Sequence, residues 1–182
     1  VIALDEGDQA NKVAFRDELF QWDAPFTSVA TSITKIQQRF SGMIWGNENL
    51  AIVYDDWYDT RNTKTYLINP SNPSQAPKII FDRNSQDIYA DPGNFETKKN
   101  QFNREVLAIE NGSTYLIGDG NTKDGQFPFI DEFNLETLKS KRLYTSKMKD
   151  KKEDLLGIED FKKGEVLVMI QSKNDYPNYY FR

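Results

Sequence analysis

The 182-residue sequence contains no cysteine and no histidine. A Ser-His-Asp triad needs an imidazole to accept and return the proton of its nucleophile, and most other nucleophile–base pairs in hydrolases also use histidine. We therefore predict that this chain holds no catalytic residue. The two absent residue types are also the ligands that zinc favours, so we predict no metal site and no cofactor.

Long apolar runs are also absent. No stretch is long enough to span a bilayer, and the chain does not start with the pattern of a signal peptide. Lysine and arginine are scattered among a larger number of acids, and the net charge is −5, so no basic stripe for nucleic acid is evident. We expect a soluble protein without a membrane span or a nucleic-acid partner. A cysteine-free chain fits the cytoplasm, and it equally fits the periplasm or a secreted protein.

The sequence is rich in short runs of β-branched and aromatic residues, which turn residues separate. Asn111-Gly112 is the strongest of these turn signals, because it is typical of a two-residue hairpin loop. Two groups of four runs each predict antiparallel four-stranded meanders. The first group is Arg39–Trp45, Leu50–Tyr54, Thr63–Ile68 and Lys78–Asp82, and the second is Glu105–Ile109, Ser113–Ile117, Phe127–Phe133 and Lys139–Thr145.

The four-stranded units recur about every 45–65 residues. Such units in series are typical of propeller blades. We therefore predict an all-β chain that forms a segment of a β-propeller, with about two complete blades and two partial ones. The expected boundaries are blade remnants at 1–38, blades at 39–100 and 101–150, and a partial blade at 151–182. A β-sandwich with chance spacing is the alternative.

Two acidic stretches contain residues of the kind found in catalytic or calcium-binding sites. Asp55, Asp56 and Asp59 could form the carboxylate pair of a glycosidase, but adjacent acids in a polar loop are more typical of solvated turns. The stretch Asp119–Gly125 resembles a calcium loop, yet Lys123 stands where an acid or asparagine is required. We predict a plain loop in both places.

The long polar segments point to one end of the predicted blades. In an up-down blade, the loop after the second strand and the link to the next blade emerge at the same end, and functional loops gather on one side of a scaffold. Arg39 and Arg61 lie next to strand ends. Arginine is the side chain best suited to bind a carboxylate, because its guanidinium can donate to both oxygens. We take Arg61 and Arg39 as candidate substrate-binding residues, with a surface or inter-blade ion pair as the alternative. The segments are Asp5–Arg16, Asp55–Asn62, Arg83–Phe102, Gly118–Gln126 and Gln171–Pro177.

Several irregular strings resemble the propeller of the glutamyl endopeptidase-like branch of the prolyl oligopeptidase family. The resemblance is collinear and extends over nearly the whole chain. Asn69 departs from it, because the family is expected to carry Asp before Pro-Ser. The strings are Ala3-Leu4-Asp5-Glu6-Gly7-Asp8, Phe15-Arg16-Asp17-Glu18-Leu19, Asp23-Ala24-Pro25-Phe26, Arg39-Phe40-Ser41-Gly42, Asn69-Pro70-Ser71-Asn72-Pro73, Phe81-Asp82-Arg83-Asn84-Ser85-Gln86-Asp87-Ile88-Tyr89-Ala90-Asp91-Pro92-Gly93 and Pro177-Asn178-Tyr179-Tyr180.

The resemblance implies an N-terminal propeller and a C-terminal α/β-hydrolase domain that carries the triad and is not in this sequence. That domain and peptide substrates are the implied partners. The implied role is accessory: the propeller gates or selects peptides, and a propeller arginine could bind the carboxylate of a substrate glutamate.

Two other functions remain open at this point. A free-standing propeller-type interaction module is the main alternative, and a propeller glycosidase would need paired inward carboxylates. Val1–Leu4 and Asn178–Arg182 read as strands at the chain ends. Exposed strand edges invite pairing, so we also expect self-association through these two segments.

Overall fold

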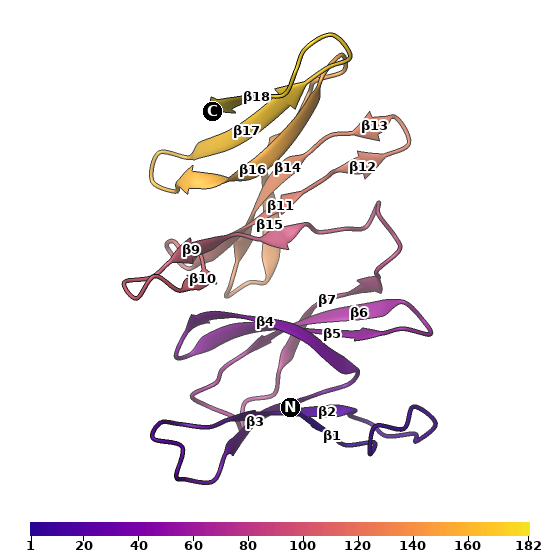
Figure 1. The fold of residues 1–182 in the computed structure, drawn as a ribbon, viewed down its shortest axis with the longest axis vertical. Helices are drawn as coiled ribbons and strands as arrows, with labels where there is room; N and C mark the ends of the chain where they lie inside the picture. The colour runs from indigo at the N-terminus through magenta and orange to yellow at the C-terminus, as the bar shows by residue number, and fades with distance from the viewer. The chain divides into compact units, whose positions relative to one another are not determined.

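The computed structural model describes all 182 residues and contains strands but no helix. It therefore contains no helix that could cross a membrane. The chain divides into two compact units, Val1–Gln86 and Asp87–Arg182, which Figure 1 shows in indigo to purple and in magenta to yellow. The predicted all-β class is confirmed.

The first unit consists of two antiparallel sheets. One has the order β1-β2-β3, and the other is a four-stranded meander with the order β4-β5-β6-β7. Their bounds are β1 (Ile2–Ala3), β2 (Asp17–Gln21), β3 (Thr31–Ile36), β4 (Arg39–Asn47), β5 (Leu50–Trp57), β6 (Asn62–Ile68) and β7 (Lys78–Asn84). The two sheets share one core, because Leu19 and Ile36 of the first cluster with Val53 and Tyr66 of the second.

The second unit also has two main sheets. Their orders are β15-β14-β11-β8 and β16-β17-β18, and two small hairpins, β9–β10 and β12–β13, accompany them. The bounds are β8 (Asn94–Phe95), β9 (Thr97–Lys99), β10 (Glu105–Leu107), β11 (Ser113–Gly118), β12 (Asn121–Thr122), β13 (Gly125–Gln126), β14 (Phe129–Asn134), β15 (Lys139–Thr145), β16 (Lys152–Asp160), β17 (Glu165–Gln171) and β18 (Asn178–Phe181). Buried Ile130, Val166 and Val168 form the core that the two sheets share.

One predicted pairing is wrong. The run Glu105–Ile109 was expected to pair with Ser113–Ile117, but β10 pairs with β9, and the outer neighbour of β11 is β8. The predicted Asn111-Gly112 turn does form, because both residues have positive φ and Glu110 and Ser113 exchange two hydrogen bonds of 2.9 Å. The strand pair does not continue beyond this turn, since the Ala108 N–H donates to the Glu96 carbonyl instead.

Sheets built from antiparallel strands that follow one another along the chain are the construction of β-propellers. Each unit carries one four-stranded sheet of this kind next to a three-stranded one. In the second unit, the Glu96 carboxylate connects the two sheets by accepting a 2.9 Å hydrogen bond from the Ile158 N–H. The chain is therefore an all-β segment of the propeller type, as predicted.

Candidate functional site

Arg39, at the start of β4, lies in a cluster of charges in the first unit. Its Nη2 donates to both carboxylate oxygens of Asp5 at 2.7 Å, and its Nη1 donates to Asp17 at 2.8 Å. Both aspartates are buried. The fork of Arg39 is thus occupied by carboxylates of its own chain, which makes an ion pair of the kind predicted as the alternative to substrate binding. A role for Arg39 in binding substrate stays a prediction, and it would require Arg39 to leave these partners.

A second arginine completes the cluster. Arg16 donates from Nη1 to Asp5 at 2.6 Å, and its Cζ lies 3.8 Å from the ring centroid of Trp57. Burial pushes the pKa of Asp5 upward, but hydrogen bonds from Arg39, Arg16 and the Gly7 N–H outweigh it and hold that pKa below its usual value. The cluster therefore ties the β1–β2 loop to the start of β4.

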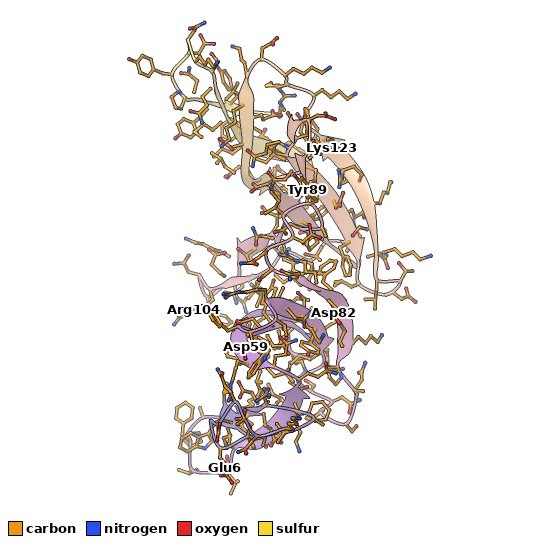
Figure 2. All side chains as sticks on the ribbon, turned by 90° about the vertical axis from the view of Figure 1, so that its right-hand side faces the viewer. Glu6, Asp59, Asp82, Tyr89, Arg104 and Lys123 are labelled. Carbon is orange, nitrogen blue, oxygen red and sulfur yellow. The ribbon has the colours of Figure 1, made fainter.

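Arg61 has a different environment, in the turn between β5 and β6. Its Cζ lies 3.7 Å from the ring centroid of Tyr58, and it makes no ion pair. Tyr58 is 68% exposed, and the loop carries exposed Asp59 (Figure 2). Stacking uses the face of a guanidinium and leaves the N–H donors at its edge available. Of the two candidate arginines, Arg61 is the one with a free carboxylate-binding edge, and its role stays a prediction.

The position of Arg61 is set by the backbone of the turn. Its φ is +56°, a left-handed conformation, and its carbonyl accepts a 2.6 Å hydrogen bond from the Ser85 N–H after β7. Trp57 and Asn62, on either side of the turn, are paired across β5 and β6. The backbone of Arg61 is therefore held where β5, β6 and β7 meet.

Asp55 differs from its predicted role. The sequence placed it among solvated turn residues, but it lies inside β5 and is fully buried. Its carboxylate accepts hydrogen bonds from the Tyr66 hydroxyl at 2.7 Å, the Gln38 N–H at 3.0 Å and the Lys64 N–H at 3.2 Å. Burial raises the pKa of Asp55 even though these donors act to lower it. Its partners indicate a structural residue that holds the link between β3 and β4.

In the second unit, two hollows flank the β12–β13 hairpin, which projects beyond the sheet in Figure 1. A hollow of about 420 Å³ has Tyr89 and Phe129 in its wall, and Arg142 bonds Asp131 there through two nitrogens. Tyr89 is 67% exposed, and Figure 2 labels it together with Lys123 of the hairpin. Phe127 lines both hollows.

The other hollow, of about 790 Å³, carries charges of both signs. Lys151 pairs with Asp175 at 2.9 Å, and Lys152 pairs with Asp154 at 2.7 Å. Lys149 and Lys173 make no ion pair, but exposed Asp124 and Asp150 line the same hollow. The hollow therefore presents polar groups of both charge signs.

Sequence reasoning found the polar segments that form these loops but missed which charges meet. Asp5 and Arg39 are separated by 34 positions, and neither local propensity nor turn chemistry reports a contact at that distance. The only available signal was the irregular string around Asp5, which no strand pattern explains.

The fold of this chain is that of an antiparallel, propeller-type segment. No family model matches the chain. It is 32% identical over 196 residues to a probable chloroplastic glutamyl endopeptidase of Oryza sativa subsp. japonica, a match that covers 98% of this chain and 21% of the relative. A protein of the same name from Arabidopsis thaliana is 32% identical over 194 residues, covering 96% of this chain and 20% of the relative.

The predicted resemblance to glutamyl endopeptidase is therefore confirmed over nearly the whole chain, which spans about a fifth of the length of these curated relatives. Among solved structures, TolB from Acinetobacter baumannii matches with a TM-score of 0.42 and 14% identity, over 92% of this chain and 35% of TolB.

Proposed function

We propose that this chain is the propeller segment of a serine peptidase that is glutamyl endopeptidase-like and of the prolyl oligopeptidase family. It would gate or select peptide substrates for a catalytic domain outside this sequence. The observation that carries the proposal is the similarity to the two glutamyl endopeptidases, which covers 98% and 96% of this chain. A chain without histidine cannot supply a Ser-His-Asp triad, which supports an accessory role.

The loop ends of the sheets support selection of peptides. Arg61 presents a free guanidinium edge beside exposed Tyr58, and a fork of this kind can bond both oxygens of a glutamate side chain. Rigid strands carry these loops, and binding residues are typically found on loops that a rigid scaffold positions.

A paired peptidase assay tests the proposal. The 182-residue chain and the full product of its gene are each incubated with a chromogenic peptide that contains one glutamate. We expect cleavage by the full product alone. Cleavage by the 182-residue chain would contradict the accessory role, and cleavage by neither would favour a propeller-type interaction module without peptidase function.

Substitution of Arg61 in the full product tests selection. Arg61→Ala removes the free guanidinium, and Arg104→Ala removes an exposed arginine of the β9–β10 hairpin as the matched control. Because hydrogen bonds to charged groups contribute about 1.5–3 kcal/mol, we expect Arg61→Ala to lower kcat/KM for a glutamate peptide by about tenfold or more. The value for the matching glutamine peptide should stay within about twofold. Equal losses on both peptides would reject Arg61 as a selecting residue.

A further inference from the structure

The second unit contains a cavity that the proposed gating role does not use. It measures about 310 Å³ and lies between the β8-β11-β14-β15 sheet and the β16-β17-β18 sheet. Ile130, Leu155 and Val168 form part of its apolar wall. The rings of Tyr115 and Phe161, which also line it, lie 5.4 Å apart. Figure 1 shows the first of these sheets in pink to orange and the second in orange-gold to yellow.

The size of the cavity matters because protein interiors are close-packed. An apolar cavity of about 150 Å³ stays dry and binds benzene, and small-molecule sites start at about 300 Å³. The volume here is at the lower end of that range. It therefore suits a ligand of one aromatic ring with a short alkyl chain.

Two residues that line the cavity, Tyr144 and Arg182, contact Glu153, which lies outside the lining. Glu153, with 1% of its surface exposed, accepts a 2.7 Å hydrogen bond from the Tyr144 hydroxyl. Its other oxygen is ion-paired with Nε of Arg182 at 3.0 Å but accepts no hydrogen bond. Arg182 lines the cavity, and its side chain is 45% exposed.

Arg182 approaches Glu153 most closely through Nε, and its two terminal nitrogens make no hydrogen bond within the chain. They remain as donors at the mouth of an apolar cavity, and arginine bonds a carboxylate with two parallel hydrogen bonds. A cationic head group would be repelled by Arg182, whose Nε is itself ion-paired with the Glu153 carboxylate.

We propose that this cavity is a binding site for a small carboxylate with an apolar body, such as an arylalkanoate. The aromatic part would lie between the sheets, among Leu155, Phe161 and Val168, and the carboxylate would meet Arg182. This site is separate from the loop ends assigned to peptide selection, so its failure would leave the proposed function unaffected.

Isothermal titration calorimetry on the 182-residue chain tests the site, with 4-phenylbutyrate as the probe and its amide as the uncharged comparison. We expect saturable binding of the acid with a negative heat-capacity change, which is the robust sign of apolar burial. Arg182→Gln should lower the affinity for the acid by about tenfold, because hydrogen bonds to charged groups contribute about 1.5 kcal/mol. The affinity for the amide should not change.

A pair of matched substitutions tests the location. Leu143 lines the mouth of the cavity and is 49% exposed, whereas Leu156 is 47% exposed and does not line it. Leu143→Trp should fill the mouth and abolish binding, while Leu156→Trp should leave it unchanged. Both residues are exposed, so neither change requires the core to repack.

Three results would overturn the proposal. The first is that the folded chain does not bind 4-phenylbutyrate saturably, and the second is that the wild-type chain binds acid and amide equally. The third is that the two tryptophan variants lose affinity to the same extent. The comparison of acid with amide in Arg182→Gln remains decisive if Leu143→Trp does not fold.

Discussion

At the scale of single residues, buried carboxylates explain more of this protein than exposed ones. Asp5 and Asp55 both stand in stretches that look like polar loops in the sequence, yet both are buried and fully engaged. A carboxylate is tolerated inside a protein only when hydrogen bonds or opposite charges replace its lost water. The partners found here, two arginines for Asp5 and a tyrosine with two backbone N–H groups for Asp55, provide that replacement.

Removing the Asp55 carboxylate should destabilise the first unit. Asp55→Ala leaves the Tyr66 hydroxyl and two backbone N–H groups without their acceptor, and a buried unsatisfied group costs about 1–3 kcal/mol. We expect the free energy of unfolding in urea to fall by about 3 kcal/mol. The neighbouring exposed Asp56 is the matched control, and Asp56→Ala should change it by less than about 0.5 kcal/mol. Similar losses from both variants would argue against the role of Asp55.

The charge cluster around Asp5 should make stability depend on acid pH. The pKa of Asp5 in the folded chain is below the ordinary value of 3.8, so the unfolded chain binds the proton more readily. The stabilising contribution is then complete above the ordinary pKa and disappears as the pH falls through the lower folded value. In urea titrations at a series of pH values, we expect Asp5→Asn to be less stable at pH 7 and to lose less stability than the wild type below pH 3.8. Parallel pH curves for the two proteins would contradict this assignment.

At the scale of elements, turn chemistry and the β4-β5-β6-β7 meander were readable from the sequence, but the strand next to β11 was not. Asn111-Gly112 forms the predicted turn, but β8 lies next to β11, where Glu105–Ile109 was predicted. Gly93 precedes β8, and its Cβ position would lie 2.4 Å from the Ile117 carbonyl oxygen. The backbones of Gly93 and Ile117 therefore lie close together where β8, a strand of only two residues, forms the sheet edge.

Two glycine substitutions separate the cost of backbone conformation from that of close approach. Gly112 and Gly93 both have positive φ, of 80° and 84°, but a Cβ at Gly112 meets nothing within 4 Å. Gly112→Ala should cost about 1 kcal/mol, the price of a left-handed alanine. Gly93→Ala should cost more than about 3 kcal/mol, because the Ile117 backbone has to move as well. Thermal and urea unfolding measure both, and equal costs would show that the contact at Gly93 is easily relieved.

At the scale of the whole molecule, each sheet is open and ends in edge strands. β18 is an edge strand whose four residues are all exposed, with Tyr179 at 64% and Phe181 at 65%. An exposed edge presents free N–H and C=O groups to other chains. We therefore expect this 182-residue chain to self-associate through β18.

Light scattering over a range of concentrations measures this self-association. Tyr179→Lys places a charge on the edge strand and should shift the chain toward monomer. Tyr176→Lys, in the adjacent loop and 90% exposed, is the control and should leave the association unchanged. A wild-type chain that stays monomeric at high concentration would show that β18 does not mediate pairing.

The sequence by itself determined the class of this protein. Alternating apolar residues and turn residues act over a few positions, so the all-β class and the Asn111-Gly112 turn could be predicted, and the irregular strings led to the glutamyl endopeptidases. The partners of Arg39, the burial of Asp55, the edge position of β8 and the cavity beside Arg182 were decided only by the tertiary structure. Each depends on contacts between residues far apart in the chain, and many alternative contacts satisfy the same local pattern until the sheets pack.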